Sequence, residues 1–182
     1  MEQEHIRKLY ERLGVDRFYQ DYGDQYTNPH EAQVKQLVLQ NQERLDYSSV
    51  LDFCAGGGEV SQILLNLGYV DFKASDPYTY RLYEQKLGKK CEKWSFDQVL
   101  RGQMSGEYSC IICSFAMHLC DENKLYNLCV QLFQHTASLV ILTPHKRPVL
   151  ENFEGIDLVF EDHVLTPKGK KIYLKTYTCA WK

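Results

Sequence analysis

The chain has 182 residues, 44% of them hydrophobic and 25% charged, with a net charge of −3 at pH 7. Its length suits one well-buried domain better than two, and no apolar run approaches the length of a membrane span. The mild acidic balance gives no general attraction to nucleic acid or anionic membranes, and the charged N-terminus does not read as a signal peptide, so we expect a soluble, cytoplasmic protein.

Residues 1–47 are expected to form a helical N-terminal cap. Within it, Asn28 is predicted to be the N-cap of a helix, with Pro29 at the first helical position and Glu31 at the third. Apolar residues then recur at helical spacing.

From Val50 onward, strand-like and helix-like runs alternate. Strands are predicted at 50–53, 69–76, 89–94, 108–115 and 138–145, and helices at 59–68, 78–88 and 121–136. This alternation predicts βαβ units and a mostly parallel sheet.

Two further strand-like runs, 156–165 and 170–181, are joined by a short turn that contains Pro167 and Gly169. Such a pair predicts an antiparallel hairpin. The expected fold is therefore α/β: a single-domain, three-layer sandwich over residues 1–182, with a mostly parallel seven-stranded sheet, a C-terminal antiparallel hairpin and the helical N-terminal cap.

The seven cysteines are expected to be reduced, because their number is odd and no secretory signal is present. Cys110 and Cys113 form a C-x-x-C, but they lie in a predicted strand, where residues three apart point to opposite faces. Such a pair cannot clamp a metal, and no second pair completes a zinc site. We expect both thiols in the core.

The run VLDFCAGGGEV, residues 50–60, leads from a strand into three glycines. A glycine-rich turn that opens a helix lets a ligand touch backbone N–H groups. The phosphate loop of nucleotide hydrolases would need G-x-x-x-x-G-K-[ST], which is absent. The dinucleotide fingerprint G-x-G-x-x-G is nearly met by Gly56, Gly58 and Ser61, but its last glycine is missing.

The same run resembles the first motif of class I S-adenosylmethionine-dependent methyltransferases, hydrophobic-hydrophobic-Asp-x-Gly-x-Gly-x-Gly, with Cys54 at the first glycine position. The resemblance implies that the turn of Cys54, Ala55, Gly56 and Gly58 receives the carboxylate of S-adenosylmethionine. It also implies that Asp52 favours the cationic sulfonium and ammonium groups. An aspartate would repel a dinucleotide pyrophosphate, which disfavours a nicotinamide-dependent oxidoreductase.

The resemblance continues along residues 48–182, the expected catalytic core. It implies that Asp76, followed by Pro77, accepts both ribose hydroxyls; the alternative is a helix N-cap. It implies adenine binding by the segment after the third strand, where Phe96 packs on the ring and Ser95 or Asp97 meets the exocyclic amine. Core packing is the alternative for Phe96. The remaining expected cofactor-binding residues, at the end of the fourth strand, are Ser114 and Phe115.

The segment before the first strand is rich in aromatic residues. These residues either pack the N-terminal helices onto the sheet or form a lid over the cofactor that excludes water. The resemblance implies the lid, with Tyr26 as the residue that contacts the methionine side.

The acceptor side is less defined. His118 is a candidate general base, although a histidine at a strand–helix junction often only hydrogen bonds backbone. His30 and His145 are candidate substrate residues; a metal site formed by the three histidines is disfavoured because nothing fixes their geometry. Arg147, in the proline-bracketed TPHKRP, carries the hypothesis of an anionic acceptor.

The sequence thus predicts an S-adenosylmethionine-dependent methyltransferase, similar to a small branch of that family, that acts on a small molecule. The Asn/Asp-Pro-Pro-Tyr/Phe signature of enzymes that methylate exocyclic amines of nucleic-acid bases is missing after the fourth strand. The alternatives are an RNA- or protein-directed methyltransferase and a non-catalytic cofactor-binding module. No metal and no membrane partner are expected.

Overall fold

The computed structural model describes residues 12–22 and 27–182. Its strands form one sheet in the order β3-β2-β1-β4-β5-β7-β6. Their bounds are β1 Val50–Phe53, β2 Phe72–Ser75, β3 Cys91–Glu92, β4 Cys110–Ser114, β5 Leu139–Thr143, β6 Ile156–Leu165 and β7 Lys171–Cys179. Neighbours among β1 to β5 pair in parallel, whereas β7 is antiparallel to both β5 and β6. The predicted α/β fold with a C-terminal antiparallel hairpin is confirmed.

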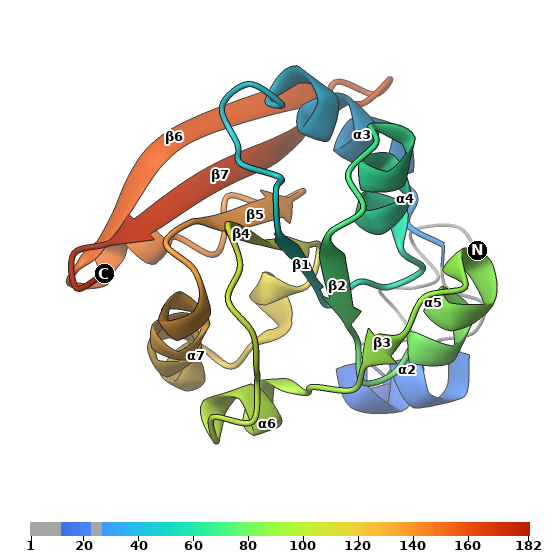
Figure 1. The fold of residues 1–182 in the computed structure, drawn as a ribbon, viewed down its shortest axis with the longest axis horizontal. Coiled ribbons are helices and arrows are strands. Elements are labelled where there is room, and N and C mark those ends of the chain that lie inside the picture. Colours follow the sequence, from blue (N-terminus) through green and yellow to red (C-terminus); the bar gives the residue numbers. More distant parts are fainter. Residues whose placement is uncertain (1–11, 23–26) are drawn as a thin grey trace.

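Helices cover both faces of the sheet (Figure 1). On one face lie α6, Phe96–Leu100, and α7, Glu122–His135; on the other lie α3, Glu31–Gln40, α4, Glu59–Asn66, and α5, Tyr80–Leu87. The short helix α2, Val15–Tyr22, lies beside the start of α5, and 3₁₀ turns occupy Met117–Leu119 and Leu150–Asn152. None of the helices in the described ranges is long and apolar enough to cross a bilayer.

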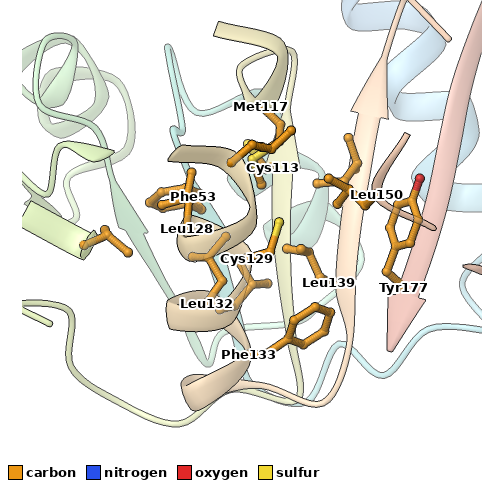
Figure 2. Packing of buried hydrophobic residues seen from close by; sticks show 14 of the residues in the cluster. Phe53, Cys113, Met117, Leu128, Cys129, Leu132, Phe133, Leu139, Leu150 and Tyr177 are labelled. Carbon is orange, nitrogen blue, oxygen red and sulfur yellow. The ribbon is translucent and has the colours of Figure 1, made fainter. Parts of the chain in front are cut away.

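Alternation along the central strands separates the two larger clusters of the core, and a third, smaller cluster of Ala55, Ala74, Tyr83 and Cys91 lies beneath α5. In β1, Leu51 and Phe53 pack with residues of α7, whereas Val50 packs with residues of α3 and α4. Figure 2 shows the first cluster, with Leu128 and Leu132 of α7 in it beside Phe53. Because both faces of β1, β4 and β5 are buried, these strands present their carboxyl ends as a rigid platform.

The start of α3 differs from the prediction. Its N-cap is His30, with no side-chain cap bond, and Pro29 lies in the turn before the helix. The side chain of Asn28 instead accepts a hydrogen bond from the His30 backbone N–H at 2.9 Å. Asparagine competes for backbone donors in this way, so it closes a turn here and the helix begins two residues later than expected.

Two other differences are local. The helix α6 was not predicted, although Ser95 and Gln98 form a capping box at its start. The predicted strand 89–94 shortens to two residues, Cys91–Glu92. All seven cysteines are unpaired, and Cys110 and Cys113 are fully buried.

Candidate active site

A cavity of about 400 Å³ opens at the carboxyl ends of β1, β2 and β4. Many predicted residues line it, namely Cys54, Ala55, Gly56, Asp76, Pro77, Ser95, Phe96, Asp97, Ser114 and Phe115. The other lining residues were not predicted to belong to the site; they are Asp16, Asn28, Glu59, Val60, Tyr78, Trp94, Ala116, Leu119, Cys120, Asp121 and Lys124. Open α/β sheets bind ligands at this edge, next to the point where the strand order reverses.

The turn between β1 and α4 forms one wall of the cavity. Cys54, at the position of the first motif glycine, has a left-handed backbone with φ of 59°. Its thiol is hydrogen bonded to that of Cys113, and this contact, together with burial, raises the pKa of Cys54. A non-glycine residue in this conformation is uncommon. Cys54 therefore keeps the shape of the glycine turn while anchoring it to β4.

Gly58 serves a different purpose from the predicted ligand contact. It does not line the cavity. A Cβ at this position would lie 2.3 Å from Leu87 Cδ1 and 3.0 Å from Tyr83 Cδ2. The close approach that excludes a side chain here is that of α5, and the predicted contact of Gly58 with a ligand stays a prediction.

Asp76 connects two turns of the cavity wall. One carboxylate oxygen accepts from Gly56 N at 3.1 Å, and the other accepts from Tyr78 N at 2.9 Å and Thr79 N at 2.8 Å. The two readings of Asp76 are thus compatible, because it caps the turn before α5 and also faces the cavity. Thr79 adds a bond from its hydroxyl to the Gly56 carbonyl at 2.8 Å.

Asp52 lies behind the turn and not in the cavity. Its side chain is fully buried, and one carboxylate oxygen accepts from the Ser61 hydroxyl at 2.6 Å and the Ser61 N–H at 3.0 Å. The other oxygen has no hydrogen-bond partner among the described residues. Burial raises the pKa of Asp52 to about 7. Asp52 therefore supports the start of α4, and its predicted contact with a ligand stays a prediction.

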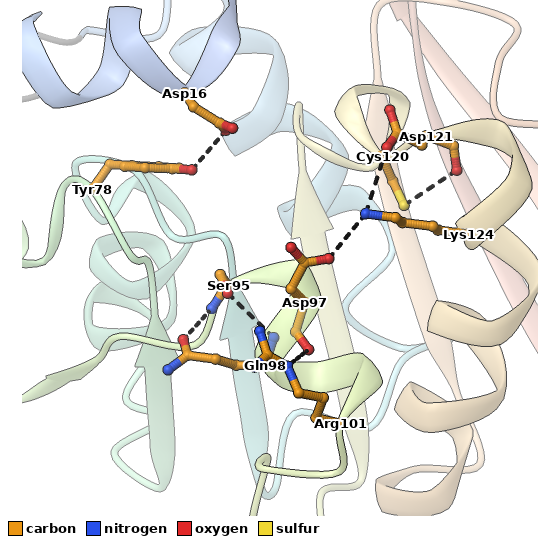
Figure 3. Close-up of polar contacts among 9 residues, drawn as sticks. All are labelled: Asp16, Tyr78, Ser95, Asp97, Gln98, Arg101, Cys120, Asp121 and Lys124. Atoms are coloured by element: carbon orange, nitrogen blue, oxygen red, sulfur yellow. Dashed lines mark hydrogen bonds and ion pairs between the residues drawn. The ribbon is translucent and has the colours of Figure 1, made fainter.

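The far end of the cavity is built around α6. The Ser95 hydroxyl accepts from Gln98 N at 3.2 Å, and the Gln98 side chain accepts from Ser95 N at 2.9 Å (Figure 3). Phe96 lies 6.0 Å from Phe53 between ring centroids, and Trp94 lines the cavity beside it. Two aromatic side chains, Trp94 and Phe96, therefore line the cavity where adenine binding was predicted, and Ser95 also caps the helix.

An ion pair crosses from α6 to α7 at this end. Lys124 Nζ lies 3.1 Å from Asp97 and 3.7 Å from Asp121 (Figure 3). Asp97 is therefore already paired with Lys124. No pattern in the sequence connects the two residues, because they lie 27 positions apart.

The end of β4 forms the opposite wall. Phe115 has a left-handed backbone with φ of 58°, and its ring stacks on His30 at 5.5 Å between centroids. The Ser114 hydroxyl is buried and has no hydrogen-bond partner within the described part of the chain. A strained residue and an unsatisfied hydroxyl beside a cavity are typical of a ligand site.

Helix α2 closes over the cavity from the N-terminal side. Tyr78 donates a hydrogen bond from its hydroxyl to Asp16 at 2.7 Å, and both residues line the cavity (Figure 3). Phe18 of the same helix is fully buried. The predicted contact of Tyr26 lies outside the described residues.

Three of the candidate acceptor residues lie on the other side of the segment 114–120, whereas His30 is buried against Phe115 and lines neither cavity. His118, His145 and Arg147 line a separate groove, and the rings of His118 and His145 are 5.2 Å apart between centroids. Desolvation, and then His145, lower the pKa of His118 to about 4, although the residue as a whole is exposed. Its imidazole is therefore neutral at pH 7. Nowhere in residues 12–22 or 27–182 do three metal-ligating side chains gather closely enough to hold a metal.

The cavity is negatively charged. Among the residues that the structure describes, one lysine, Lys124, and five carboxylates line it; the carboxylates are those of Asp16, Glu59, Asp76, Asp97 and Asp121. Burial raises the pKa of Glu59, which begins α4. Such a lining favours a ligand with positive charge.

No protein-family model matches the chain. An uncharacterised protein of Schizosaccharomyces pombe is 28% identical over 189 aligned positions, which cover 79% of this chain and 76% of that protein. Among solved structures, magnesium protoporphyrin IX methyltransferase of Synechocystis PCC 6803 with bound S-adenosylmethionine superposes with a TM-score of 0.64 at 16% identity, covering 96% of each chain. The N-methyltransferase NodS of Bradyrhizobium japonicum WM9, in complex with S-adenosylhomocysteine, gives a TM-score of 0.63 at 13% identity, covering 96% of this chain and 98% of that chain.

Proposed function

We propose that this chain, which has the fold of the class I S-adenosylmethionine-dependent methyltransferases, binds S-adenosylmethionine and transfers its methyl group to a small-molecule acceptor. The observation that carries the proposal is the cavity at the end of β1 and β2, which is lined by a glycine turn, by Asp76 and by the aromatic side chains of Trp94 and Phe96. The excess of carboxylates suits a ligand that carries a sulfonium and an ammonium.

Each part of the cofactor has a complementary partner in the cavity. The turn at Ala55 and Gly56, at the N-terminus of α4, suits the methionine carboxylate. Asp76 suits the ribose hydroxyls, and Phe96 and Trp94 suit the adenine ring. The unsatisfied hydroxyl of Ser114 is available to a polar group of the ligand.

Methyl transfer needs alignment more than acid–base chemistry. The nucleophile of the acceptor forms a bond to the methyl carbon as the sulfur–methyl bond breaks, and the electron pair stays on the sulfur of S-adenosylhomocysteine. Holding the two reactants in line supplies most of the rate enhancement. If the nucleophile arrives protonated, the candidate to accept the proton is His118, which lies within the segment 114–120 on its groove side and has a neutral imidazole at pH 7.

The proposal is tested by calorimetry with S-adenosylhomocysteine and, separately, with NADH. We expect the protein to bind S-adenosylhomocysteine at micromolar concentration or below, and not NADH. Asp76→Ala should weaken binding by about 1–3 kcal/mol, a factor of about 5 to 150, because it removes a charged acceptor from the ribose.

The matched control is Thr79→Val, which removes another hydrogen bond to the same turn without altering the cavity lining. It should keep most of the affinity. A loss as large as that of Asp76→Ala would mean that Asp76 acts only by shaping the turn, and a folded wild-type protein that does not bind S-adenosylhomocysteine would refute the proposed function.

A further inference from the structure

A second cavity, of about 1100 Å³, lies along the other side of the segment 114–120. We call it the cationic groove, because its lining includes Lys146, Arg147, Lys170 and Lys171, together with His118 and His145. Among the described residues that line it, Glu122 is the only carboxylate. The groove therefore has the opposite charge to the cavity proposed for the cofactor.

The four cations come from two distant parts of the chain. Lys146 and Arg147 follow β5, whereas Lys170 and Lys171 lie where the β6–β7 turn enters β7. Lys170 and His145 are both close enough to His30 that their charges lower its pKa, after the larger effect of burial. The β6–β7 turn thus approaches the segment that follows β5.

The segment after β5 is held in a defined position. The Thr143 hydroxyl accepts from His145 N and donates to the Arg147 carbonyl, both at 3.1 Å. The side chain of Lys175, which is 4% exposed, donates to the Lys146 carbonyl at 3.0 Å. A buried lysine that fixes the backbone beneath two exposed cations indicates a built site and not a disordered basic loop.

The groove adjoins the proposed cofactor cavity. Both are lined by Cys120, and the segment between them carries Phe115 and Ala116 on the cofactor side and Met117 and His118 on the groove side. A molecule that lies in the groove can therefore reach toward the cofactor past the end of β4.

Arg147 can exchange its present ion-pair partner for an anionic ligand at little cost in stability. Its ion pair with Glu122 is 3.5 Å long, and the two side chains are 80% and 88% exposed. Exposed pairs of this kind contribute little to stability. An anion can displace Glu122 and receive two parallel hydrogen bonds from the guanidinium.

We propose that the methyl acceptor is a small molecule with a carboxylate or phosphate group, and that the cationic groove binds this anionic group. The inference rests on the proposed function, because it concerns the acceptor of the same reaction. The groove, at about 1100 Å³, is slightly larger than the usual small-molecule site of about 300–1,000 Å³, so it can hold a small molecule. A nucleic acid would need a longer basic surface than these four cations provide.

The first experiment measures anion binding directly. Protein saturated with S-adenosylhomocysteine is titrated with pyrophosphate and, separately, with citrate, so that phosphate and carboxylate recognition are distinguished. We expect one of the two anions to bind, with at least tenfold weaker binding to Arg147→Gln/Lys171→Gln. The control Lys35→Gln/Lys73→Gln removes the same charge from exposed positions outside the groove and should bind like the wild type.

The second experiment identifies the acceptor class. A cell extract separated by anion exchange into retained and unretained small molecules, and a third pool of total RNA, are each incubated with the protein and methyl-labelled S-adenosylmethionine. We expect label in the retained pool, strongly reduced for Arg147→Gln/Lys171→Gln. Label only in the unretained or RNA pool, or equal labelling by this variant and the wild type, would overturn the proposal.

The outcomes separate the two proposals. If neither anion binds to the wild type better than to the groove variant, the groove proposal fails, even when no pool is labelled. The affinity for S-adenosylhomocysteine should stay within twofold of the wild type in both double variants. The proposed function fails only if that affinity is absent from the wild-type protein.

Discussion

Gly58 shows how one residue can serve packing where the sequence suggests ligand binding. It has a φ of 87°, and a Cβ there would meet Leu87 at 2.3 Å. Gly58→Ala combines a left-handed backbone with a clash against α5, so we expect a loss of about 2–4 kcal/mol in the free energy of unfolding. Urea denaturation of the variant and the wild type measures this loss.

Gly88→Ala is the matched control. Gly88 also has a positive φ, 64°, but a Cβ there meets nothing within 4 Å. Only the backbone penalty of about 1 kcal/mol then applies. Equal losses in the two variants would contradict the role assigned to Gly58.

The raised pKa of Asp52 predicts that the stability of the fold depends on pH. Burial raises its pKa to about 7 from the ordinary value of 3.8. Between about pH 4 and 7 the folded protein therefore binds a proton that the unfolded chain has released. The stabilisation that comes from this difference in proton binding is present in full below about pH 4 and is lost as the pH rises through 7.

The test compares the wild type with Asp52→Asn by urea denaturation at pH 5 and pH 8. The wild type should lose about 2–3 kcal/mol more than the variant over this range, because asparagine does not titrate. The amide oxygen can keep the bonds from Ser61. Parallel pH curves for the two proteins would show that Asp52 is already ionised in the fold at pH 5.

At the scale of elements, α2 is the part most separable from the rest. It contacts the cavity through the hydrogen bond between Asp16 and Tyr78 at 2.7 Å. Because both residues line the cavity, a bound cofactor should hold α2 in place. We expect amide hydrogen exchange in residues 15–22 to slow when S-adenosylhomocysteine is added.

Tyr78→Phe should reduce this slowing, because it removes the hydroxyl that bonds to Asp16. Tyr80→Phe removes a neighbouring hydroxyl that does not line the cavity and should leave it unchanged. Mass spectrometry of exchanged peptides measures both. Exchange in residues 15–22 that is the same with and without ligand would make α2 an ordinary packing element.

At the scale of the whole molecule, the sheet places two cavities of opposite charge on either side of one segment. The cavity proposed for the cofactor is lined by five carboxylates and one lysine, and the cationic groove by four basic side chains and Glu122. A net charge of −3 gives no indication of this separation, because the two groups nearly cancel. The separation of the two charged cavities suits a cationic methyl donor and an anionic acceptor that must meet at one point.

The sequence by itself determined the sheet and most of the cavity wall. Periodicity identified most of the strands and helices, and their alternation predicted a mostly parallel sheet, because parallel neighbours need a crossover that a helix supplies. The ends of the parallel strands fall at a common edge, and the resemblance to class I methyltransferases assigned Cys54, Asp76 and Ser114 to a ligand site there; all three line one cavity.

Only the tertiary structure decided what these residues touch. Asp52 is turned toward Ser61 by the alternation of side chains along β1, Gly58 is held by Leu87 of a later helix, and Lys124 reaches Asp97 from α7. The contacts of Gly58 with Leu87 and of Lys124 with Asp97 join segments whose separation in the sequence carries no periodic or local signal. The physical reason is that secondary structure follows from neighbours along the chain, whereas side-chain pairing, burial and the resulting charge of a cavity follow from packing between distant segments.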